Sequence, residues 1–312
     1  MNCIKFGKLE VKIPDRFSDN FGEPINYLLN FLIQLNEENP TEIYFDFSGS
    51  KFISPIIIGG IVAITHSLKN QGKKVEFIFR QNTIAPTYFN TIHFPEGYNF
   101  SHMSSAEMND KLENYNLKTF IPLILFPTAA NKADSSLREN VLSAINSILK
   151  KQLKLTGNVI EAVYYLVDEL TNNVSDHSES HKGILFAQFY PTKNYMDICI
   201  ADFGRGIKQT YLDSGKATPR THEEAIEFAI NGKSTKNQTI SRGFGISTSR
   251  RMLTEGLKGK FFPCSGNAMF YQNSEKQEII ALPEKANYSG CLIALRIPTL
   301  PNNQFNFYQY TQ

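Results

Sequence analysis

The sequence is short of cysteine, of excess charge and of long apolar runs. Its four cysteines, Cys3, Cys199, Cys264 and Cys291, are widely spaced and form no CxxC pair. This spacing argues against a disulfide framework or a zinc site and fits a reducing cytoplasm. The formal net charge is only +2, so we expect neither a broad basic surface for nucleic acid nor an acidic tail.

The longest apolar run, residues 52–64, is too short to span a membrane and contains Pro55, Gly59 and Gly60. It is better interpreted as the end of a buried strand that leads into a buried helix. The N-terminus has no basic segment followed by a long apolar core, so no secretory signal is predicted. These features predict a cytoplasmic protein without a membrane segment.

A chain of 312 residues is long for one domain, and two domains are predicted. A weakly patterned polar segment at 97–118 marks the boundary, which gives domains at 1–112 and 116–312. Strand and helix patterns alternate in the first domain and predict a small α/β sandwich. Its strands are expected at 41–50 and 75–80, and its helices at 23–39 and 54–74.

The second domain is predicted to be a two-layer α/β (α+β) sandwich, with helices on one side of a mostly antiparallel sheet. A long polar segment precedes Arg242. Helices are expected at 135–153, 158–178 and 243–256, and strands at 120–126, 183–191, 195–204 and in several stretches between 259 and 298.

The helix at 158–178 carries a polar stripe beside its apolar one. Glu169, Asn173 and His177 follow one another in steps of four, which aligns them along one side of the helix. Such a stripe is either a solvated face or one wall of a site.

Two glycine pairs lie downstream of this helix. The segment Asp202-Phe-Gly-Arg-Gly206 follows an apolar strand, and Gly243-Phe-Gly245 opens a helix. Glycine allows a backbone to come close to a ligand, and a helix N-terminus offers unpaired amides to a phosphate. With the polar stripe, these segments lead to the hypothesis of a nucleotide site.

The three motifs resemble, in order and spacing, those of the GHKL ATPase superfamily, which contains DNA gyrase, histidine kinases and MutL. The stretch from Glu169 to Asn173 is similar to the family's N-box, residues 202–206 to its first glycine box and residues 243–245 to its second. The resemblance covers roughly residues 116–300 and implies the Bergerat α/β sandwich of that family.

The resemblance implies a role for each motif. Asn173 would bind Mg²⁺, which also binds the triphosphate of ATP, and Glu169 would act as the catalytic base. Asp202 would accept a hydrogen bond from the adenine amino group. The implied cofactor-binding residues are Asn173, His177, Asp202, Gly204, Gly206, Ile207, Lys236, Arg242, Gly243, Gly245 and Ile246.

The roles of five residues are left open. His177 could cap the C-terminus of its helix or face the phosphates. Lys233, Lys236 and Arg242 could belong to the ATP lid of the family or to a solvated loop. Cys291 stands where many family members have threonine after a glycine, which puts one hydrogen bond to the nucleotide in doubt.

One similarity is rejected. The sequence Asn-Gly-Lys-Ser-Thr at 231–235 is like the end of a P-loop, but the glycine that this motif needs is replaced by Glu227.

Within the superfamily, the chain looks most like the anti-sigma-factor serine kinases. The helix at 135–153 has no phosphoacceptor histidine, and too few residues follow residue 298 for a transducer domain. Members of that group commonly have a histidine four residues after the asparagine, as His177 is here.

The first domain resembles the STAS fold of anti-sigma-factor antagonists, the usual partners of those kinases. The resemblance is carried by one strand, loop and helix between residues 42 and 64 and departs from the family at Ser54-Pro55-Ile56-Ile57, where the acceptor position is apolar. This favours a docking or regulatory role over a phosphoswitch.

The sequence thus predicts a cytoplasmic, Mg-ATP-binding regulatory protein that transfers phosphate to a protein serine or threonine or hydrolyses ATP slowly as a switch. The alternative is a non-catalytic interaction module with ATP as a structural ligand. The expected partners are ATP and a protein such as a STAS domain or a sigma-factor-like regulator; a homodimer is left open.

Overall fold

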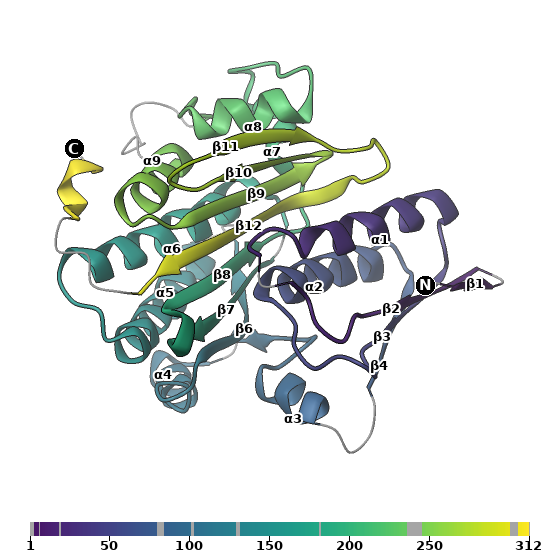
Figure 1. The fold of residues 1–312 in the computed structure, drawn as a ribbon, viewed down its shortest axis with the longest axis horizontal. Helices are drawn as coiled ribbons and strands as arrows, with labels where there is room; N and C mark the ends of the chain where they lie inside the picture. The colour runs from purple at the N-terminus through teal and green to yellow at the C-terminus, as the bar shows by residue number, and fades with distance from the viewer. Residues whose placement is uncertain are drawn as a thin grey trace.

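The computed structural model describes residues 3–5, 7–18, 20–79, 84–100, 103–128, 132–180, 182–235, 245–299 and 305–311. Helices and two sheets alternate through these segments (Figure 1), so the predicted mixed α/β fold class is confirmed at that level. Among the described residues, no helix combines the length and the apolar composition that crossing a membrane requires.

The first sheet has four strands in the order β1-β2-β3-β4. Strands β2, β3 and β4 are parallel, whereas β1 is antiparallel to β2. The predicted strands and helices of this half are all present within a few residues of the expected bounds. The elements are β1 (Cys3–Lys5), β2 (Lys8–Lys12), α1 (Ile25–Glu38), β3 (Glu42–Asp46), α2 (Pro55–Asn70), β4 (Lys74–Ile78) and α3 (Ile84–Thr91).

The second sheet has eight strands in the order β11-β10-β9-β12-β8-β7-β6-β5 and is antiparallel except for the pair β5 and β6. Its strands are β5 (Tyr98–Asn99), β6 (Phe120–Pro127), β7 (Lys182–Tyr190), β8 (Tyr195–Ala201), β9 (Lys260–Gly266), β10 (Ala268–Gln272), β11 (Gln277–Ala281) and β12 (Tyr288–Pro298). Its helices are α4 (Ser105–Glu113), α5 (Lys132–Leu153), α6 (Asn158–His177), α7 (Gly206–Ser214), α8 (His222–Ile230) and α9 (Gly245–Arg251), which continues into one π-helical turn, Met252–Gly256. Short 3-10 turns lie at Pro191–Lys193 and Phe307–Gln309.

Helix α2 lies between the two sheets. Residues Pro55 to Thr65 are buried all round the helix, and α2 packs on β4 of the first sheet and on β7, β8 and β12 of the second. Figure 1 shows α5 and α6 on the other face of the second sheet. Strand β8 is therefore covered on both faces, which explains why every residue from Met196 to Ala201 is buried. The second half thus has a layer on each side of its sheet instead of the single helical layer expected.

The segment around the predicted domain boundary is ordered by the second sheet. Strand β5 pairs with β6, and α4 packs on α5. Ser104 and Glu107 form a capping box at the start of α4, in which each side chain bonds the backbone N–H of the other. One continuous apolar core runs from β2 and α1 through α2 to the second sheet.

Two helices lie within the long polar segment that precedes Arg242. Helix α7 follows the Asp202–Gly206 turn directly, and α8 begins after Thr221, whose side chain accepts a hydrogen bond from the backbone N–H of Glu224. Their own small core consists of Tyr211, Ala217 and Ala225.

Candidate functional site

Helix α6 separates its apolar and polar residues as its sequence pattern predicts. Val163, Val167, Leu170 and Val174 are buried in the core. The polar stripe of Glu169, Asn173 and His177 is half-buried and lines a cavity. This stripe is therefore the wall of a cavity and not an open, solvated face.

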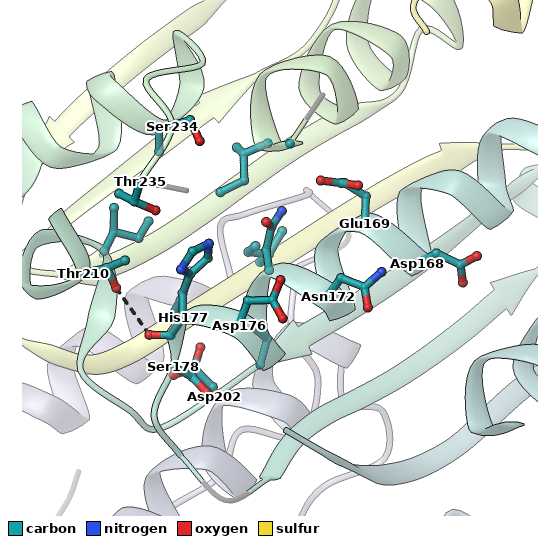
Figure 2. Close-up of a pocket in the computed structure, with 18 of the residues that line it drawn as sticks. Asp168, Glu169, Asn172, Asp176, His177, Ser178, Asp202, Thr210, Ser234 and Thr235 are labelled. Carbon is teal, nitrogen blue, oxygen red and sulfur yellow. Dashed lines mark hydrogen bonds between the residues drawn. The ribbon is translucent and has the colours of Figure 1, made fainter. Parts of the chain in front are cut away.

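The cavity has a volume of about 820 Å³. Residues of α5, α6 and α7, of the end of α8 and of the start of α9 line it. Figure 2 shows the α6 side chains from Asp168 to His177 with Asp202, Thr210, Ser234 and Thr235 around the cavity. Besides the predicted residues, its lining includes Arg138, Glu139, Asn146, Tyr165, Asp168, Asn172, Asp176, Ser178, Thr210, Tyr211, Lys233, Ser234, Thr235, Ser247 and Cys291.

Most of the sequence-predicted site residues meet at this cavity. Those that line it are Glu169, Asn173, His177, Asp202, Gly206, Ile207, Gly245 and Ile246. Gly204 supports the turn below the cavity without lining it. The predictions for Lys236, Arg242 and Gly243 lie outside the described residues.

Asp202 is the most buried acid of the cavity, with 2% of its surface exposed. Its Oδ1 accepts a hydrogen bond of 2.8 Å from the backbone N–H of Gly204. Burial raises the pKa of Asp202 to about 7, against the opposing effect of the N–H groups of Gly204 and Cys291. The site therefore holds a desolvated carboxyl group that accepts hydrogen bonds from backbone amides.

The turn from Asp202 to Gly206 needs both of its glycines. A Cβ on Gly204 would collide with the carbonyl oxygen of Ser178. Gly206 has φ +75° and would place a Cβ 2.8 Å from Ser265 Oγ, so a larger residue is excluded there by backbone strain and by contact. These constraints fix the direction in which the end of β8 enters the cavity.

Hydrogen bonds attach this turn to the end of α6. The backbone N–H of Arg205 donates to Ser178 O at 3.0 Å, and its Nε donates to His177 O at 2.9 Å. The Arg205 guanidinium also pairs with Glu179 and Asp213, each at 2.8 Å. Arg205 is thus a structural clamp between α6, the turn and α7.

The glycine-led helix α9 begins beside the carboxylate of α6. A Cβ on Gly245 would lie 4.0 Å from Glu169 Oε1, and α6 packs on α9. The cavity therefore contains two separate acidic groups: Asp202 in the turn after β8, and Glu169 beside the N-terminal residues of α9.

Asn173 has an unpaired polar atom within this wall. Its Nδ2 is buried and has no hydrogen-bond partner among the described residues. The two ends of a carboxamide are interchangeable by rotation, so either its oxygen or its nitrogen can be offered to a ligand.

His177 ends α6 and lines the cavity. Its carbonyl oxygen accepts the hydrogen bond from Arg205 and one from Thr210 Oγ1 at 3.4 Å (Figure 2).

The sequence did not reveal what α5 contributes. Arg138 Nε and Asn146 Oδ1 of α5, together with Tyr165 Oη of the neighbouring helix α6, belong to residues that line the cavity and lack hydrogen-bond partners among the described residues. Asn146 Nδ2 donates to Asp168 Oδ1 at 3.2 Å, and the pKa of Asp168 is raised, chiefly by burial. The sequence around Arg138 and Asn146 does not indicate that these residues lie opposite α6, because contacts between two helices leave no local pattern in either one.

The P-loop-like stretch has the wrong surroundings for that motif. Gly232 and Lys233 follow helix α8, whereas a P-loop follows a strand and opens a helix. Lys233 instead lies over the Phe228 ring at 3.8 Å from its centroid, and its carbonyl accepts from Tyr211 Oη at 2.6 Å. Both Lys233 and Ser234 line the cavity.

Comparison with known proteins yields no family, no characterised protein and no solved structure that matches the chain. Within the described residues, no group of three or more His, Cys, Asp or Glu side chains is placed to hold a metal ion.

Proposed function

We propose that the chain binds Mg-ATP in the cavity beside α6 and acts as a GHKL-like ATPase or protein serine/threonine kinase. The observation that carries the proposal is the meeting of three separate motifs at one cavity. Residues of the α6 stripe, of the turn after β8 and of the start of α9 all line it. Chance surface polarity would not be expected to bring them together.

Asp202 is the proposed adenine-binding residue. A buried acceptor next to the glycines of a tight turn suits a flat base with one amino group to donate. The bond would form in a desolvated place, where an unsatisfied partner is costly. Guanine presents a carbonyl at the corresponding position, so this acceptor would favour adenine.

The phosphates are proposed to lie toward Glu169 and the start of α9. Backbone N–H groups at a helix N-terminus bind anions, and Ser234 and Lys233 line the same cavity. Mg²⁺, when bound, neutralises phosphate oxygens and takes most of its ligands from phosphate and water. The Asn173 carboxamide, whose Nδ2 has no hydrogen-bond partner within the described part of the chain, fits a single protein ligand to such an ion.

Glu169 is the proposed general base. It stands one helical turn before Asn173 on the same stripe, so it can accept the proton of a hydroxyl or water held near the metal-bound phosphate. If a protein hydroxyl is the acceptor, the chain is a kinase, and if water is the acceptor it is an ATPase. In the alternative, a binding module, Glu169 would have no effect on phosphate release.

We further propose that the first 112 residues have a docking or regulatory role. The position of Ser54 favours such a role over a phosphoswitch, because Ser54 Oγ is buried and has no hydrogen-bond partner among the described residues. A kinase could not reach that hydroxyl without local opening.

The test is incubation with γ-labelled ATP and Mg²⁺, alone and with candidate partner proteins, followed by measurement of free and protein-bound phosphate. Glu169→Gln keeps the size of the side chain and removes the base. Turnover that is lost in this variant while ATP still binds would support catalysis. Wild-type turnover in Glu169→Gln would contradict the catalytic role and favour the binding module.

A further inference from the structure

Residues at and just after the end of β8 have side chains on both faces of the second sheet. Alternate residues of a strand point to opposite faces. Cys199 points toward α2, where a Cβ on Gly59 would lie 2.5 Å from its Sγ. The alternation continues beyond the strand, so that Asp202 lines the cavity whereas Phe203 lies against α2.

Phe203 stacks on His66 of α2. The two ring centroids are 5.3 Å apart and the ring planes differ by 9°. Both side chains are half-buried. The pKa of His66 is lowered by burial and by the nearby Lys69 and Lys182, which favours the neutral imidazole in the contact with Phe203.

Helix α2 packs closely on the second sheet, and this brings His66 next to the turn that follows β8. Gly59 and Gly60 present no side chain to the sheet, and a Cβ at Gly60 would collide with Leu28 and lie 3.1 Å from Leu292 Cδ1. The helix therefore sits directly on β8 and β12, and His66, two turns further along, meets the residue that follows Asp202.

The turn is thus held from two sides. On the α6 side, Arg205 bonds to His177 and Ser178. On the α2 side, the ring of His66 covers Phe203. The second contact restricts the residue whose backbone is joined directly to that of Asp202.

We propose that His66 is a positioning residue for the ATP site: its ring fixes Phe203 and thereby the Asp202–Gly206 turn, so that the first half of the chain sets the affinity of the site. This inference rests on the proposed ATP binding. Without the stack, the turn would have to be ordered when ATP binds, and that cost would lower the affinity.

Four variants test the inference in the full-length protein. His66→Ala and Phe203→Leu each remove the stack from one side, whereas His66→Phe keeps a flat ring. Asn70→Ala, at an exposed position of the same helix, is the matched control. The readouts are ATP affinity by calorimetry and hydrogen exchange of the amides at 203–207 without nucleotide.

The expected result is that His66→Ala and Phe203→Leu weaken ATP binding roughly three- to tenfold, the range of a lost aromatic pair, and speed exchange at 203–207. His66→Phe and Asn70→Ala should stay within about twofold of the wild type.

Wild-type affinity and exchange in both His66→Ala and Phe203→Leu would overturn the inference while leaving the proposed function intact. A His66→Phe variant as weak as His66→Ala would also overturn it, because the stack would not be the cause. If the wild type bound no ATP, the proposed function and this inference would both be overturned.

Discussion

Replacing Asp202 by asparagine tests how the cavity would recognise adenine. The substitution keeps the shape of the side chain and removes one acceptor. Two backbone N–H groups, those of Gly204 and Cys291, already need the oxygens at this position. The single oxygen of asparagine would be held by them, and its NH₂ group would face the amino group of adenine, donor against donor.

The size of the effect follows from the burial of Asp202, which is 2% exposed. Water cannot replace a lost acceptor at such a place, and the unsatisfied donor costs roughly 1–3 kcal/mol. Since about 1.4 kcal/mol corresponds to tenfold, the ATP dissociation constant should rise about tenfold or more. Asp110→Asn, at an exposed position on α4, is the control and should bind as the wild type does.

The pKa of Asp202 adds a dependence on pH. It is raised from 3.8 to about 7 in the folded protein, whereas the adenine amino group would favour the ionised carboxylate. ATP binding should therefore release a proton and weaken as the pH falls below about 7, and Asp202→Asn should remove this dependence. The raised pKa of Asp202 also makes the stability of the fold depend on pH. The stability that this group contributes is fully present below its unfolded pKa of 3.8 and is lost as the pH rises through about 7.

Calorimetry in buffers of different ionisation enthalpy, from pH 6 to pH 8, measures affinity and proton release together. An Asp202→Asn variant that binds ATP as tightly as the wild type at pH 8 would refute the assignment of this residue.

Three further predictions concern the rest of the site and the core. Glu169→Ala should leave ATP affinity unchanged and abolish phosphate release, whereas Asn173→Ala should weaken ATP binding only when Mg²⁺ is present. Nucleotide titrations with and without Mg²⁺ distinguish the two variants. Equal effects of the two substitutions would contradict the separate roles. Gly204→Ala should prevent ATP binding and lower the melting temperature, because its Cβ meets the carbonyl of Ser178; unchanged values would show that the turn tolerates a side chain. Deleting residues 1–100 should expose the faces of β7, β8 and β12 that α2 buries. Each large aliphatic side chain that becomes exposed should lower the free energy of unfolding by about 1.5–3 kcal/mol. A soluble fragment that unfolds cooperatively would contradict the shared core.

Much of the fold was predictable where the pattern was local. The apolar stripe of the segment 158–178 predicted α6, and the alternating strand and helix patterns of the first half predicted α2 within a few residues of its bounds. Helices α7 and α8 were missed because each has only nine residues, too few for a clear helical pattern. The pair Thr221 and Glu224, a capping signal three residues apart, could have identified the start of α8.

Contacts between distant segments were not predictable from single patterns. The all-round burial of α2 depends on β7, β8 and β12 of the second sheet, which follow much later in the chain, as well as on the adjacent strand β4. For the same reason, no local feature of His66 indicates that it stacks on Phe203. The motif residues of the cavity were identified because their types recur in a known order, whereas Arg138 and Asn146 on α5 were not, since nothing in their own segment distinguishes them from surface residues.

The most direct test of the account is calorimetric titration of the full-length protein with ATP and with GTP, each in the presence of Mg²⁺. The account predicts saturable binding of one ATP per chain and much weaker binding of GTP, because the buried acceptor at Asp202 can pair with the amino group of adenine. Equal affinity for the two nucleotides, or no binding of ATP, would contradict it.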